Sequence, residues 1–202
     1  MLDPHRALAD LETIRVQLAR QTRFLGFGPA ALAMTAALAL VTGFVQSIYQ
    51  SDDTTPLAFF GVWIAIAIVS VAIVGAEVVR RSRRFHRGLS DAMLIQAVEM
   101  FLPVGLAGAC LGLVFARCAL DQVWMLPGLW QMLVGLGLFA AGRSLPWQSG
   151  FVGGWYLVSG CAVFVLASET HILSPALMAV PFAVGQAAMA VVVARFGGAR
   201  DV

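Results

Sequence analysis

Glu99 is a carboxylate in an otherwise apolar stretch, and it is the strongest candidate for intramembrane chemistry. Gln96 precedes it by three residues, so the two side chains share one face of a helix. Pro103 follows by four residues and has no N–H to donate to the carbonyl of Glu99. A carboxylate, an amide and an unpaired carbonyl together could bind a proton, a cation or a polar headgroup.

Glu99 also has a structural interpretation, as one half of an ion pair. A long apolar stretch separates it from Arg117, which puts it within a turn or two of one membrane boundary. There its carboxylate could pair with Arg143 or with an arginine of the run at 80–87. The sequence favours this pair over a functional site. Glu77 precedes Arg80 by three residues, the spacing of a local helix pair.

Two glutamines lie in later apolar stretches, where interhelical hydrogen bonding is the usual role and is worth about 1 kcal/mol or less. Pro181 leaves the carbonyl of Leu177 without its helical donor. It marks either a plain kink or, with Gln186, a broken helix that lines a cavity. The candidate intramembrane polar site comprises Gln96, Glu99, Pro103, Gln131 and Gln186.

No motif for catalysis or for a cofactor occurs in the sequence. It contains neither HExxH, nor a Walker loop, nor GxGxxG, nor a Ser-His-Asp set. The three histidines fall in different polar segments, and the three cysteines have no CxxC spacing. We therefore expect no enzymatic activity, no metal site and no cofactor.

The composition is that of a chain solvated by lipid. Hydrophobic residues make up 60% and charged residues 12%, against about 45–50% and 25% in soluble domains. Such a short chain has too little interior to bury this much apolar surface. A net charge of +2 does not indicate the basic surface that nucleic-acid binding requires. These values exclude a soluble enzyme, a disordered tail and a secreted disulfide domain.

The apolar residues are grouped in stretches near the ~20 residues that a membrane-spanning helix needs. Backbone groups in lipid must be paired within the segment, so each stretch is expected to be helical. The predicted fold is an all-α membrane protein with six transmembrane helices in three hairpins. The stretches are 25–48, 57–79, 93–116, 126–142, 150–168 and 174–194.

The arginines predict the orientation in the membrane. All 13 basic residues are arginines, and only Arg117 falls outside the segments expected on one side. Because positive residues mark the cytoplasmic face, both termini are predicted to be cytoplasmic. The basic cytoplasmic face that we predict comprises Arg80, Arg81, Arg83, Arg84, Arg87 and Arg143.

Three segments follow from this pattern. Residues 1–23 are predicted to form a cytoplasmic amphipathic helix, since Leu8, Leu11 and Leu18 recur at helical spacing. It could lie on lipid or pack against protein. Residues 24–196 form the six-helix domain, and residues 197–202 form a cytoplasmic tail. Gly105, Gly108 and Gly112 are predicted to mediate helix packing, either within one chain or in a homo-oligomer.

Two segments carry a resemblance to known proteins: Asp10-Leu-Glu-Thr-Ile-Arg15 and Leu126–Pro146. They resemble parts of a group of small uncharacterised bacterial multi-pass inner-membrane proteins, which are often encoded beside a winged-helix regulator. The resemblance implies a location in the bacterial inner membrane and a cytoplasmic protein partner. It transfers no catalytic residue.

The sequence therefore favours a non-enzymatic membrane partner, sensor or regulatory subunit that presents a basic cytoplasmic face. The alternative is a small transporter or channel with a polar site around Glu99. The expected partners are membrane lipid and a protein at the cytoplasmic face, and further copies of the chain are a third candidate. The transporter hypothesis requires the polar residues to line one path, whereas the partner hypothesis does not.

Overall fold

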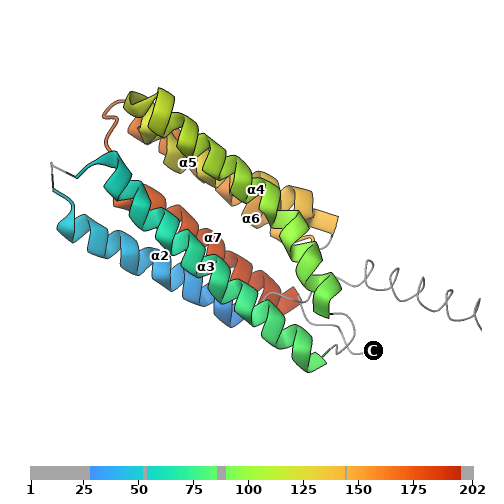
Figure 1. Cartoon of the computed structure of the whole chain (residues 1–202). Helices are drawn as coiled ribbons and strands as arrows, with labels where there is room; N and C mark the ends of the chain where they lie inside the picture. The colour runs from blue at the N-terminus through green and yellow to red at the C-terminus, as the bar shows by residue number, and fades with distance from the viewer. Residues whose placement is uncertain (1–27, 52–53, 86–89, 144, 197–202) are drawn as a thin grey trace, which may run out of the picture.

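Six helices in the computed structural model are long and apolar enough to cross a membrane. The structure describes residues 28–51, 54–85, 90–143 and 145–196 (Figure 1), without the side chains of 81–85, 90–98, 100 and 143. The predicted segments 1–23 and 197–202 and Arg87 lie outside this part. The same holds for the side chains of Gln96, Arg81, Arg83, Arg84 and Arg143.

The described residues form helices joined by short connections, and no strand occurs among them. This confirms the all-α class and the six apolar stretches. Two short 3₁₀ helices, η1 (Leu120–Met125) and η2 (Ala141–Arg143), flank the fourth spanning helix. The α-helices are α2 (Pro29–Tyr49), α3 (Pro56–Phe85), α4 (Ser90–Cys118), α5 (Leu126–Ala140), α6 (Ser149–Ala167) and α7 (Pro175–Phe196).

Prolines begin four of these helices. Pro29, Pro56 and Pro175 are the first residues of α2, α3 and α7, and Pro127 lies in the first turn of α5, where a missing N–H costs nothing. The segment before Pro127 lies between two of the predicted apolar stretches, and there η1 runs directly into α5. It lengthens the fourth span from the 15 residues of α5 to 21. Burial of Val123 and Leu126 stabilises this extension.

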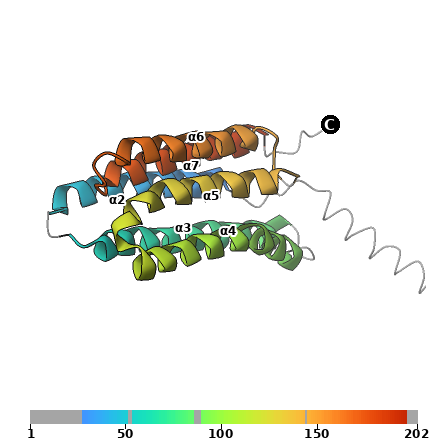
Figure 2. The ribbon, with the colours of Figure 1, turned by 90° about the horizontal axis from the view of Figure 1, so that it is seen from above.

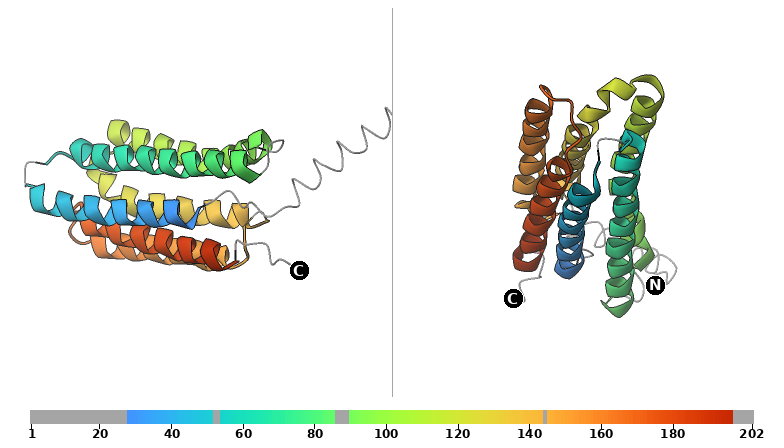
Figure 3. Two further views of the ribbon diagram at one scale, coloured as in Figure 1. Left: turned by 90° about the horizontal axis from the view of Figure 1, so that it is seen from below. Right: turned by 90° about the vertical axis from the view of Figure 1, so that its left-hand side faces the viewer.

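The helices form three layers of two (Figures 2 and 3): α6 with α7, α2 with α5, and α3 with α4. The most extensive contacts join α2 to α7 and α5 to α6, across the first two layers. Burial follows this order. In an 18-residue stretch of the span that contains α5, 44% of the residues are buried, whereas none is buried in the α4 span Phe101–Cys118. The core therefore lies mainly between the first two layers and extends to α3, whose Phe59 and Trp63 are buried, while α4 is peripheral.

Glycines allow α5 and α6 to approach each other closely. A Cβ atom at Gly128 would lie 2.9 Å from the carbonyl oxygen of Gly160, and one at Gly135 would lie 2.9 Å from that of Gly153. Each helix thus contributes two glycines seven residues apart, on one face. Small residues at such crossings bring backbones into van der Waals contact, which drives helix association in lipid.

Contacts between neighbouring helices show which helix ends lie together. α2 and α7 are antiparallel, because Gln50 donates to the Leu173 carbonyl at one end while Thr35 lies against Gln186 nearer the other. The remaining helices alternate in the same way (Figure 1). We call the end that holds Arg80, η2 and Arg195 the arginine end. Arg117 lies at the opposite end.

Candidate functional site

The interior polar contacts gather on α7, where Pro181 interrupts the helical hydrogen bonds. Pro181 cannot donate to the carbonyl of Leu177. That carbonyl instead accepts a hydrogen bond from Nε2 of Gln131 on α5, at 2.9 Å. Gln131 is fully buried. The free carbonyl and the interhelical role of the glutamine were separate predictions, and the structure joins them in one contact.

Two aromatic side chains of α6 reach the same part of α7. Trp155 donates from Nε1 to the carbonyl of Pro181 at 3.0 Å, and Tyr156 donates its hydroxyl to the carbonyl of Phe182 at 3.3 Å. Tyr156 is buried, and a Cβ atom at Gly185 would collide with its ring. Side chains of α5 and α6 therefore supply donors to three α7 carbonyls around the proline.

Gln186 connects this cluster to α2. Its Oε1 lies 3.3 Å from the hydroxyl of Thr35, which also lies 2.8 Å from the carbonyl of Leu32. Tyr156 lies beside the Gln186 side chain as well. Gln186 thus contacts polar groups on both sides of α7. Gln131 and Gln186 both make contacts that hold helices together, as expected for amides in apolar surroundings.

Glu99 lies apart from these two glutamines. It is exposed on α4, in the peripheral layer, and α4 continues through the exposed Pro103 as a helix. A Cβ atom at Gly137 would lie 2.7 Å from Val104, so Glu99, further toward the arginine end, lies level with η2. Gln131 contacts α7 at Leu177, nine residues before Gln186 on the same helix, so the two glutamines have different partners, and Glu99 lies on the surface of another layer.

The glycines of α4 face a tryptophan of the same chain. Trp130 of α5 donates from Nε1 to the carbonyl of Gly108 at 3.1 Å. Cβ atoms at Gly108 and Gly112 would lie 3.6 and 3.7 Å from the Trp130 ring. A Cβ atom at Gly105 would meet no described atom within 4 Å. The Trp130 ring therefore packs against Gly108 and Gly112 of the same chain.

Glu77 is a nearly buried carboxylate at the arginine end. Its Oε2 accepts from Arg80 at 2.6 and 2.9 Å, which confirms the predicted local pair. No local pattern in the sequence indicates its second contact. A Cβ atom at Gly28 would lie 2.6 Å from Glu77 Oε1. Gly28 caps α2 without a side-chain hydrogen bond, so a carboxylate lies beside a helix N-terminus, which favours negative charge.

Three buried polar atoms have no hydrogen-bond partner among the described residues: Oε1 of Gln50 and Nε1 of Trp124 toward the opposite end, and Oε1 of Gln131 within the fourth span. Such atoms are costly unless water or a ligand meets them. In the part of the chain that the structure describes, no cluster of His, Cys, Asp or Glu could hold a metal ion. No family model matches the chain, and no curated protein or solved structure is significantly similar to it.

Proposed function

We propose that the protein is a non-enzymatic integral membrane partner, either a sensor or a regulatory subunit, that binds a companion protein through α4. The observation that carries the proposal is the exposure of this helix: none of the residues from Phe101 to Cys118 is buried. An apolar spanning helix that adds so little to its own core has faces available for a helix of another protein.

The interior contacts support this function, because the polar side chains around α7 serve helix packing. Gln131, Trp155 and Tyr156 each donate to a backbone carbonyl of α7. These bonds join α5 and α6 to α7, and the contact of Gln186 with Thr35 joins α7 to α2. A core held by such contacts, with α4 at its periphery, suits a subunit whose surface, and not its interior, performs the function.

The arginine end supports the predicted orientation. Arg80, Arg195 and the η2 residue Arg143 occur at this end of the bundle, and basic residues favour the cytoplasmic side. We infer a bacterial inner-membrane protein of three hairpins, with both termini in the cytoplasm. The arginines of residues 80–87, most of which lie in the last turns of α3, and the segment 1–23 would then present charge to a cytoplasmic part of the companion.

One observation favours a second candidate, a small transporter or channel. Oε1 of Gln131 is fully buried and meets no donor among the described residues. An amide oxygen of this kind could accept a hydrogen bond from a polar substrate or from water in a pathway. Transport would then depend on Gln131, whereas binding of a companion would not.

Native cysteines allow a direct test of the proposal. Cys110 lies on α4 and Cys161 on α6, and both are exposed. Single-cysteine variants would carry a photoreactive maleimide at one site or the other, in native membranes. We expect Cys110 to cross-link to one companion protein and Cys161 not to. Replacing the arginines of residues 80–87 with glutamine should lower the yield from Cys110.

Three outcomes would contradict the proposal. Equal yields from Cys110 and Cys161 would show contact without specificity. A product of twice the chain mass from Cys110 would assign α4 to a homo-oligomer. Solute flux in proteoliposomes of the purified protein, abolished by Gln131→Leu at normal folding, would favour the transporter.

A further inference from the structure

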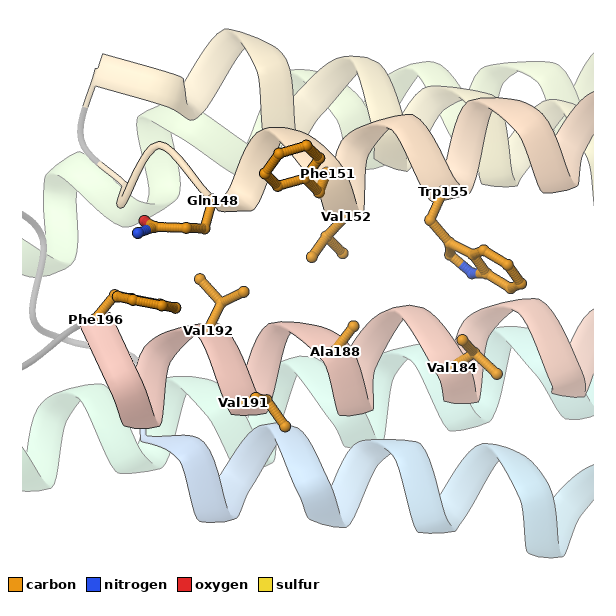
Figure 4. A pocket seen from close by; sticks show the side chains of 9 residues that line it. All are labelled: Gln148, Phe151, Val152, Trp155, Val184, Ala188, Val191, Val192 and Phe196. Carbon is orange, nitrogen blue, oxygen red and sulfur yellow. The ribbon is translucent and has the colours of Figure 1, made fainter.

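An apolar groove runs along the outside of the bundle between α6 and α7 (Figure 4). Its volume is about 470 Å³. Gln148 and Phe196 lie at one end, and Trp155 and Val184 lie at the other. The walls between them are formed by Phe151 and Val152 of α6 and by Ala188 and Val192 of α7.

The groove is polar and cationic at one end only. Gln148 is the one polar side chain among the residues that line it, and it lies at the arginine end. Arg195 follows Val184, Ala188 and Val191 at intervals of four, three and four residues, so it continues the face of α7 that borders the groove. Arg195 is exposed. A ligand with a long apolar part and an anionic head matches this pattern.

Aromatic residues mark the same end. Trp147 is 68% exposed, and its ring packs edge-on against Phe151 with centroids 5.4 Å apart. Tryptophan favours the level of the lipid headgroups. Trp147, Gln148 and Arg195 together therefore indicate where the polar head of an occupant would lie, with Phe151 at the start of its apolar part.

The dimensions of the groove match one lipid chain. From Val184 to Phe196 the groove follows α7 for about 18 Å at the helical rise, close to the roughly 15 Å hydrocarbon depth of a single leaflet. A helix of a second copy that crosses the membrane would extend over about 30 Å of hydrocarbon, well beyond this groove, whereas one acyl chain of a single leaflet would not.

We propose that this groove binds one anionic phospholipid of the leaflet at the arginine end. An acyl chain lies along Val184, Ala188 and Val192, and the phosphate accepts hydrogen bonds from Arg195 and Gln148. The apolar walls exclude water, and a void against them would lose dispersion contacts. The guanidinium of Arg195 selects the anionic head. This site is independent of the companion that we propose for α4.

Native mass spectrometry of the purified protein in detergent can test the site, with phosphatidylglycerol or phosphatidylcholine added. We expect one retained lipid per chain and a preference for phosphatidylglycerol of about fivefold, from one arginine near the headgroups. Arg195→Gln should remove the preference and leave the binding of phosphatidylcholine. Arg195 is exposed, so this variant keeps the fold.

Ala188→Trp would fill the middle of the groove, and we expect it to lower the retention of both lipids at least tenfold. Ala187 is the matched control, because it is an exposed neighbour that does not line the groove. Ala187→Trp should retain lipid as the unchanged protein does. Trp155 gives a readout that needs no substitution at Ala188. A phospholipid brominated along its acyl chain should quench the fluorescence of Trp155, and this quenching should be lost in the Trp155→Phe variant.

Several results would overturn the proposal. Equal lipid loss from Ala187→Trp and Ala188→Trp would show that the groove is not the site. An unchanged preference for phosphatidylglycerol in Arg195→Gln would show that the lipid headgroup does not lie at the arginine end of the groove. A lipid-free dimer that Ala188→Trp dissociates would assign the groove to a second copy. Equal quenching in Trp155→Phe and in the unchanged protein would show that the acyl chain does not lie in the groove.

Discussion

Gln131 and Leu177 are joined across the interface between α5 and α7, where Nε2 of the glutamine lies 2.9 Å from the carbonyl oxygen of the leucine. This carbonyl is the acceptor that Pro181 leaves without a helical donor. A proline is tolerated inside a spanning helix when a neighbour satisfies the freed carbonyl. The contact thus explains both why a fully buried glutamine occurs on α5 and how α7 accommodates its proline.

The energetic link between these residues can be measured with a double-mutant cycle. Gln131→Leu should lower the free energy of unfolding by about 1 kcal/mol, the usual scale for an interhelical hydrogen bond in membranes. In a Pro181→Ala background, the new N–H can donate to Leu177, so Gln131→Leu should cost much less. Unfolding in mixed detergent micelles gives the four free energies.

Gln186→Leu serves as the control for this cycle. Gln186 contacts Thr35 and not the carbonyl of Leu177. Gln186→Leu should therefore lower the free energy of unfolding by the same amount with and without Pro181→Ala. Equal costs of Gln131→Leu in the two backgrounds would mean that the glutamine does not compensate for the proline.

The sequence predicted the local half of this contact and not the other half. The free carbonyl of Leu177 follows from a spacing of four residues within one helix. Its donor depends on the rotation of α5 against α7, which no local pattern encodes. The same division holds for Glu77. Its pair with Arg80 lies within one turn of α3, whereas its contact with Gly28 joins helices distant in the chain.

Helix packing shows a similar division. The spacing of Gly108 and Gly112 was conspicuous in the sequence, and both face Trp130. The closest backbone approaches instead join α5 to α6, through the facing pairs Gly128 with Gly160 and Gly135 with Gly153. The seven-residue spacing in both helices was the available signal. A sequence rich in glycine offers many such spacings, and only the packed structure selects among them.

Gly135→Ala should destabilise the protein, although alanine is the better helix former. Its Cβ atom would lie 2.9 Å from the backbone oxygen of Gly153, which cannot move without separating the helices. We expect a loss of about 1–3 kcal/mol, as for other overpacked sites. Thermal unfolding in detergent measures it.

Gly154→Ala is the matched control on α6. A Cβ atom there would meet no described atom within 4 Å, so the substitution gains helix propensity, worth up to about 1 kcal/mol. The two variants should shift the unfolding temperature in opposite directions. A stabilised Gly135→Ala protein would contradict the close contact between α5 and α6.

Glu77→Ala should loosen the start of α2. The carboxylate lies against Gly28, where α2 has no side-chain cap, and an anion at this position favours the helix. Hydrogen exchange at the backbone amides of Ala30, Ala31 and Leu32 should become faster. Arg80→Gln should have a smaller effect, because the Arg80 side chain is 63% exposed and an exposed pair contributes little. Equal acceleration in both variants would assign the effect to the ion pair.

Glu99→Gln distinguishes the three roles that a carboxylate on α4 can have. Glu99 is exposed, so removing its charge should change the free energy of unfolding by no more than about 1 kcal/mol. If α4 binds a companion, the uncharged variant should cross-link from Cys110 in lower yield at normal stability. Thermal unfolding and cross-linking in the same membranes measure both quantities.

The other roles of Glu99 give different pairs of results. A carboxylate that anchors a buried arginine would cost about 3–5 kcal/mol when neutralised, because the cation is left without its partner. A carboxylate that binds a proton or a cation during transport would leave both stability and cross-linking intact while flux is lost, since glutamine keeps the shape but cannot titrate. Either result would contradict the role at the companion interface. Because Glu99 is exposed and level with η2, we expect small stability effects and a clear loss of cross-linking.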